Sequence, residues 1–208
     1  MSPSATRRLV VVHAGVSQPS STGLLAERLA AATSDALLER GHEALVEVVD
    51  VRDHAQALAN ALLTGFPSGA LREALEAVAS ADGVIAVTPV YQASYSGLFK
   101  MFFDALRDGE LRGTPVLMAA TAGTARHSLV LEHAMRPLFA HLKAVTVPTG
   151  VFAASEDWGA SGSVDRGLST RIGVAAAELA DLVTGQPTER TRTDDFTVTV
   201  PFEELLGG

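Results

Sequence analysis

Hydroxyl-bearing residues gather between residues 14 and 22, just before a segment with helical periodicity. This loop contains Ser17, Ser20, Ser21 and Thr22. A helix N-terminus presents free backbone N–H groups and the positive end of its dipole, and hydroxyl groups donate further hydrogen bonds to an anion. The loop therefore predicts a phosphate site. An ordinary helix cap is the alternative, but a cap accounts for one hydroxyl rather than four.

A second chemically rich stretch follows the apolar run at residues 83–87. It contains Pro89, Tyr91 and Tyr95, and it ends at Ser96. Backbone groups beside the proline can meet the polar edge of a ring, and the two tyrosines can cover an aromatic face. Ser96 is expected to cap the helix that follows. The alternative is that both tyrosines only pack on the protein surface.

These two loops must be positioned by strands that alternate with helices. Strands are predicted at residues 8–14, 44–51, 83–88, 115–120 and 145–153. Helices are predicted at residues 23–40, 52–63, 68–79, 96–107, 124–143 and 165–184. The alternation predicts an α/β fold, a five-stranded parallel sheet with helices on both faces, in the flavodoxin-like order 2-1-3-4-5. Ligands bind at the carboxyl ends of strands 1 and 3 in that order, where the two loops lie.

The length of 208 residues fits one domain with a sizeable core, which we place at residues 1–184. Residues 185–208 form a C-terminal arm, and the alternation of apolar residues over 196–202 predicts an extended strand with one buried face. The helix at residues 96–107 is apolar almost all round. It is expected to meet a second subunit, with burial under the arm as the alternative.

Composition excludes several classes of function. The chain has no cysteine, so disulfides, thiol chemistry and iron–sulfur clusters are not expected. A net charge of −8 with only two lysines argues against nucleic-acid binding. No apolar window approaches the roughly 18 residues of a membrane span, and the apolar run after Arg7-Arg8 is too short for a signal sequence. A cytoplasmic protein is expected. His127, His133 and His141 do not share a helical face closely enough to predict a metal site.

Three motifs resemble those of the NADPH-dependent FMN reductases. The segments Thr88-Pro89-Val90-Tyr91-Gln92 and Ser94-Tyr95-Ser96-Gly97 resemble the flavin loop of that family. The hydroxyl-rich loop resembles its FMN phosphate loop, and residues 120–127 match its Gly-rich loop along the flavin. The resemblance covers about residues 8–153 and is closest to the branch that supplies reduced FMN to two-component flavin monooxygenases.

The resemblance implies transfer of hydride from NADPH or NADH to FMN, assembly as a homodimer or homotetramer, and a partner monooxygenase. No catalytic side chain is expected, because the two cofactors carry the reactivity. Loop amides around Gly123 and Thr124 would stabilise negative charge on the flavin. The implied cofactor-binding residues are Ser17, Ser20, Ser21, Thr22, Pro89, Val90, Tyr91, Gln92, Ser96, Thr121, Gly123, Thr124 and Arg126.

One departure from the family pattern leaves the nicotinamide preference open. Many members carry Arg or Lys within the phosphate loop, whereas Gln18 and Pro19 stand here. Arg126 is then the cation expected near the site. Two other functions also stay open: a quinone or azo-dye reductase with tightly bound FMN, and a non-enzymatic flavin-binding electron carrier.

A proline lies well inside the helix predicted at residues 124–143. Pro137 has no N–H, so it cannot bond the carbonyl of His133. This predicts a kink or a π-bulge near His133. In the resembling branch an inserted Tyr or His lies in a π-helix at this place, which implies a role for His133 in flavin transfer. A proline-kinked surface helix with a solvated histidine is the alternative.

Overall fold

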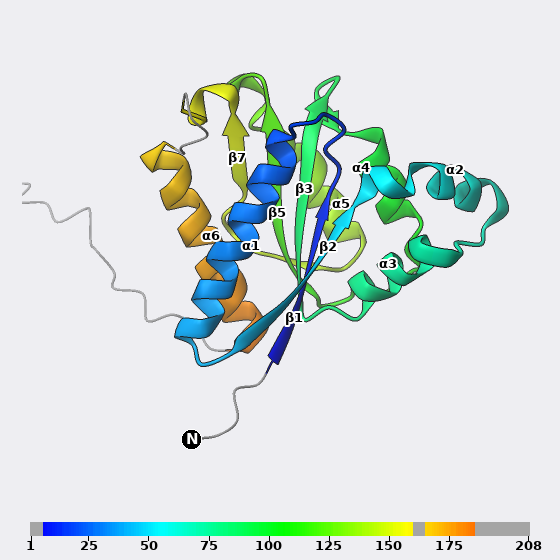
Figure 1. Ribbon diagram of the computed structural model, residues 1–208, viewed down its shortest axis with the longest axis horizontal. Coiled ribbons are helices and arrows are strands. Elements are labelled where there is room, and N and C mark those ends of the chain that lie inside the picture. The colour runs from blue at the N-terminus through cyan, green and yellow to red at the C-terminus, as the bar shows by residue number, and fades with distance from the viewer. Residues whose placement is uncertain (1–5, 160–164, 186–208) are drawn as a thin grey trace, which may run out of the picture.

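The computed structural model describes residues 6–159 and 165–185. The sheet has the order β2-β1-β3-β5-β6, with β7 also paired to β5 and the short β4 paired to β3. The strands are β1 (Thr6–His13), β2 (Glu43–Asp50), β3 (Gly83–Tyr91), β4 (Ser94–Tyr95), β5 (Pro115–Ala122), β6 (Val145–Thr146) and β7 (Val151–Ala154). The predicted parallel order 2-1-3-4-5 is confirmed, with two short strands sharing its last position (Figure 1).

The prediction of one unbroken strand over residues 145–153 is wrong. Between β6 and β7, the Val147 N–H still bonds the Val116 carbonyl at 3.0 Å. The next residue, Pro148, has no N–H to offer the ladder. The strand therefore breaks there, and β7 pairs farther along β5, up to the pair Ala122–Ala154.

Two layers of helices cover the sheet (Figure 1). The α-helices are α1 (Ser21–Glu39), α2 (Ala55–Thr64), α3 (Gly69–Ala79), α4 (Gly97–Asp104), α5 (Arg136–His141) and α6 (Arg166–Thr184). Helices α1 and α6 pack on one face, and α2 to α5 pack on the other. Short 3₁₀ turns lie at η1 (Val51–His54), η2 (Ala125–His127) and η4 (Ser155–Asp157). None of the helices in the described part of the chain has the length and apolar character that crossing a membrane requires.

Strand β1 is buried between these two helical layers. Val10 and Val12 pack in the core formed with α2 to α5, while Val11 packs in the core formed with α1 and α6. A parallel strand covered on both faces reads as a continuous apolar run rather than an alternating one. The run from Leu9 to Val12 accordingly places the end of β1 in the centre of the sheet, beside β3.

The apolar helix α4 buries most of its surface within its own chain. Phe99, Phe102 and Phe103 are at most 1% exposed, and the Phe99 and Phe103 ring centroids lie 4.7 Å apart. Phe103 also meets Phe139 of α5 edge-on at 5.1 Å. This packing accounts for the aromatic residues that suggested a subunit interface, so oligomerisation through α4 stays a prediction. The alternative cover, residues 186–208, lies outside the described residues.

The helix predicted at residues 124–143 is interrupted, and the predicted distortion at His133 is confirmed. A π-helical segment, η3 (Leu131–Met135), contains His133 and leads directly into α5. The Arg136 N–H bonds the Leu131 carbonyl, five residues earlier. Arg136 also forms a two-pronged ion pair with Glu132, at 2.5 and 2.8 Å. Its guanidinium lowers the pKa of Glu132 chiefly through these hydrogen bonds, because they favour the charged carboxylate.

The phenylalanine cluster is expected to dominate the stability of the α4–α5 layer. Replacing Phe103 with Ala should lower the free energy of unfolding by about 3–5 kcal/mol, because it leaves a cavity between two rings. Urea unfolding followed by circular dichroism measures this loss. The control is Phe66→Ala, whose side chain is 81% exposed and whose replacement should cost within about 0.5 kcal/mol. Equal losses in the two variants would contradict the assignment of the core.

Candidate functional site

Three loops meet at the carboxyl ends of β1, β3 and β5. His13 of β1 pairs with Val87 of β3, and Pro89 of β3 pairs with Thr121 of β5. The hydroxyl of Thr22, at the start of α1, lies 2.8 Å from the hydroxyl of Thr121, and both residues are buried. This hydrogen bond joins the first loop to the third loop directly.

The first loop folds back on itself at the N-terminus of α1. Ser20 is the helix cap, and its hydroxyl accepts the Gly23 N–H at 3.1 Å. A Cβ on Gly15 would lie 2.1 Å from the Ser20 hydroxyl oxygen, so a side chain there would displace the hydroxyl that caps the helix. Ser17 and Ser21 are exposed. Capping and core contacts therefore account for Ser20 and Thr22, while the other two hydroxyls face outward.

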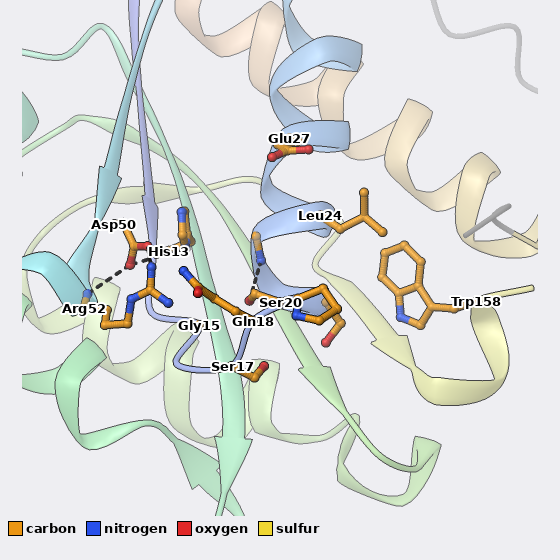
Figure 2. A pocket seen from close by; sticks show the side chains of 13 residues that line it. His13, Gly15, Ser17, Gln18, Ser20, Leu24, Glu27, Asp50, Arg52 and Trp158 are labelled. Carbon is orange, nitrogen blue, oxygen red and sulfur yellow. Dashed lines mark hydrogen bonds and ion pairs between the residues drawn. The ribbon is translucent and has the colours of Figure 1, made fainter. Parts of the chain in front are cut away.

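A cavity of about 680 Å³ lies over this loop. Figure 2 shows Leu24 and Trp158 at one end of it, and Asp50 and Arg52 at the other, with Ser17 and Ser20 between. It is lined by His13, Gly15, Ser17, Gln18, Pro19, Ser20, Ser21, Gly23, Leu24, Glu27, Asp50, Arg52 and Trp158. The cavity is therefore walled by polar groups from the end of β2 as well as by the loop itself.

Sequence reasoning missed the contributions of β2 and of the η4 turn to this cavity. Asp50 ends β2 and Arg52 lies in the η1 turn that follows, and in the order 2-1-3 the end of strand 2 adjoins the end of strand 1. The predicted strand order could therefore have identified Asp50 and Arg52 as neighbours of the first loop. Trp158, the chain's single tryptophan, comes from the segment after β7, and nothing local in the sequence ties it to the first loop.

The second loop is a β-hairpin rather than an open loop beginning at residue 88. Strand β3 continues to Tyr91 and turns through Gln92 and Ala93, which have φ angles of +48° and +66°. Two successive residues at positive φ form the kind of two-residue turn that suits a tight hairpin. Neither residue is glycine, so the turn is held in a conformation that costs backbone energy.

The hairpin presents one tyrosine and packs the other. Tyr91 is 47% exposed, whereas Tyr95 is half-buried, with its ring centroid 5.9 Å from that of Phe99. Ser96 caps α4 as predicted, because its hydroxyl accepts the Phe99 N–H at 3.2 Å. Its own N–H bonds the Thr88 hydroxyl at 3.0 Å, which fixes the base of the hairpin.

The third loop lies across from the hairpin. Thr124 accepts the Arg126 N–H at 3.4 Å and so begins the η2 turn. Arg126 is exposed and lines a cavity of about 400 Å³ together with Ala93, Ser94 and His133. Of the predicted cofactor-binding residues, the structure thus brings Arg126 to the hairpin, beside Ala93 and Ser94, which were not predicted. Pro89 pairs with Thr121, and the first loop adjoins the third through Thr22 and Thr121. In the described part of the chain, no cluster of His, Asp and Glu has the arrangement of a metal site.

Comparison with known proteins identifies relatives of the whole chain. A family model described as NADPH-dependent FMN reductase matches residues 7–159. The FMN reductase (NADPH) of Pseudomonas aeruginosa is 37% identical over 181 residues, covering 86% of this chain and 94% of its own. The NADH-dependent FMN reductase SfnE of Pseudomonas putida is 37% identical over 174 residues, covering 84% and 91%.

A solved structure of an oxidoreductase is also similar to this chain. The crystal structure of an oxidoreductase from Corynebacterium diphtheriae matches with a TM-score of 0.83 and 43% sequence identity, covering 88% of this chain and 100% of that one. The chain therefore belongs to the NADPH-dependent FMN reductase family, whose oxidoreductase activity and cofactors, FMN with NADPH or NADH, are those predicted from the sequence.

Proposed function

We propose that this protein transfers hydride from NADPH or NADH to FMN held by the three loops. The observation that carries the proposal is their convergence through the Thr22–Thr121 hydrogen bond and the pairing of Pro89 with Thr121. The phosphate of FMN would then meet the first loop, at a helix N-terminus. The flavin ring would meet the hairpin, which carries the tyrosines.

Each loop has a distinct task in this proposal. The first α-helical turn of α1 and the outward hydroxyls of Ser17 and Ser21 hold the FMN phosphate. The hairpin at Pro89–Gln92 supports the flavin ring, with exposed Tyr91 beside it. Backbone N–H groups near Gly123 and Thr124 stabilise negative charge on the reduced ring. Flavin and nicotinamide supply the hydride chemistry, so this chain's residues bind and orient rather than react.

The finer proposal is that reduced FMN leaves for a flavin-dependent monooxygenase. The π-helical segment supports it, because His133 lines the same cavity as Arg126 and the strained turn residue Ala93. A distorted helix beside a strained turn suits a site that must release its ligand. We further propose a cytoplasmic homodimer or homotetramer, as the family resemblance implies, with residues 1–184 as its folded domain.

Steady-state oxidation of NADPH and NADH, with and without added FMN, tests the activity. Oxidation should depend on added FMN and saturate with it, because FMN is a substrate that departs. The ratio of kcat/KM for the two nucleotides measures the nicotinamide preference. Rapid turnover without added FMN by a yellow protein would indicate a quinone or azo-dye reductase. Absence of nucleotide oxidation under every condition would leave only an electron carrier.

The phosphate site is tested by removing the two outward hydroxyls together. The double variant Ser17→Ala/Ser21→Ala should bind FMN more weakly by about 1–3 kcal/mol, because hydrogen bonds to a charged phosphate are lost. Isothermal titration calorimetry measures the dissociation constant. The matched control is Ser169→Ala, an exposed position on α6, which should leave FMN affinity unchanged. An unaltered dissociation constant in the double variant would place the phosphate elsewhere.

Deleting His133 tests the role of the π-helical segment. The hydrogen bond from Arg136 to Leu131 spans five residues, so removing one residue restores α-helical spacing. The deletion variant should purify yellow, hold FMN more tightly and support a coupled monooxygenase poorly, while still reducing its bound flavin. The control His133→Ala keeps the extra residue and removes only the imidazole. A colourless deletion variant that transfers flavin normally would show that the distortion is structural only.

A further inference from the structure

The first loop contains no Lys or Arg, yet a guanidinium reaches it from the η1 turn that follows β2. Among the described residues that line the cavity over the first loop, Arg52 is the one arginine, and there is no lysine. With the Gln18 amide turned so that its oxygen faces Arg52, that oxygen accepts hydrogen bonds from both terminal guanidinium nitrogens at 3.1 and 3.2 Å. Figure 2 shows Gln18 extending from the loop toward Arg52.

Asp50 holds this guanidinium in place. One carboxylate oxygen accepts the Arg52 backbone N–H at 3.0 Å, and the other accepts a guanidinium N–H at 3.1 Å. The Arg52 side chain is 31% exposed, so part of the guanidinium still faces solvent. Since β2 pairs with β1 up to the pair His13–Asp50, the sheet itself sets the distance between Arg52 and the loop. The arginine is therefore pre-positioned rather than free.

The charges around Arg52 are mixed. Asp50 and Glu27 line the same cavity, and Asp53 lies 3.9 Å from the guanidinium. The imidazole of His13 lies 4.0 Å from the Asp50 carboxylate. These carboxylates disfavour an anion, so a phosphate here requires the compensating charge of Arg52. Arg52 can therefore distinguish a ligand that carries a phosphate from one that does not.

We propose that Arg52 binds the phosphate monoester of FMN and so determines that FMN is preferred over riboflavin. This inference rests on the proposed function. The guanidinium exchanges the neutral Gln18 amide for phosphate oxygens, and an Arg–phosphate hydrogen bond is about twice as strong as one between neutral groups. Arg52 thereby supplies across the sheet the positive charge that the loop itself lacks.

Binding measurements without nicotinamide test this inference separately from turnover. Quenching of flavin fluorescence gives dissociation constants for FMN and for riboflavin, which lacks the phosphate. Arg52→Gln should weaken FMN binding about 10- to 100-fold, the loss of one or two charge-assisted bonds, and leave riboflavin binding unchanged. Arg52→Lys should restore part of the loss, because it keeps the charge without the planar fork. Arg72→Gln on α3, an exposed arginine, is the control.

A second variant predicts an effect of the opposite sign. Asp50→Asn keeps an oxygen that can accept the Arg52 backbone N–H but removes a negative charge. The repulsion between this charge and the FMN phosphate is then lost, so FMN binding should tighten about three- to tenfold, the size expected for two close charges in a partly exposed site. Riboflavin binding should not change. Asp35→Asn, an exposed position on α1, makes the same change in net charge and should alter neither ligand. A purely structural role of Asp50 predicts weaker binding of both flavins instead.

Three results would overturn the inference. Equal losses of FMN and riboflavin affinity in Arg52→Gln would assign Arg52 a structural role. If Arg52→Gln leaves the FMN dissociation constant unchanged but lowers kcat/KM for NADPH and not for NADH, Arg52 binds the 2′-phosphate of NADPH instead. That group is the other phosphate monoester among the cofactors. Unchanged binding of every ligand would assign it no role. A parent protein that binds FMN over riboflavin but oxidises no nucleotide would refute the proposed function and leave this inference intact.

Discussion

Parallel pairing of β1, β3 and β5 is the constraint on which the rest of the site depends. Strands that run the same way end at the same edge, so His13, Val87 and Thr121 bring three separate loops to one place. The strands are buried on both faces, which leaves little freedom in their register. A shift of one residue in β3 would turn its apolar side chains to the opposite face and move the hairpin relative to the first loop.

Hydroxyl groups at this edge hold the loops as well as facing the cavity. Ser20 caps α1, Ser96 caps α4, and Thr22 bonds Thr121 between two loops. Each bond satisfies a polar group that would otherwise be costly to bury. The Ser20 hydroxyl can keep its capping position because Gly15, beside it, has no Cβ. The loop's shape therefore depends on the same residues that resemble a phosphate-binding motif, which makes structural and binding contributions inseparable at Ser20.

Two departures from regular backbone lie near the hairpin. Gln92 and Ala93 both have positive φ angles, and the π-helical segment around His133 lies across the smaller cavity from Ala93. Hydrogen bonds from Arg136 stabilise the π-helical segment. Arg136 bonds Glu132, the Thr146 hydroxyl and the Pro148 carbonyl, and so ties the distorted helix to the interrupted last strand. Both departures from regular structure border the smaller cavity beside the hairpin.

The sequence by itself determined the alternation of strands and helices, the strand order, the cap at Ser96 and the distortion before Pro137. The elements, the cap and the distortion follow from local chemistry: apolar periodicity, a hydroxyl at a helix start, and a missing N–H. The strand order follows from the alternation of strands and helices, which limits the possible topologies. Only the tertiary structure decided that Thr22 bonds Thr121, that Arg52 reaches Gln18, and that the phenylalanines of α4 are covered within the chain. These contacts join residues far apart in the sequence, and they depend on side-chain directions that appear only after the sheet has brought the segments together.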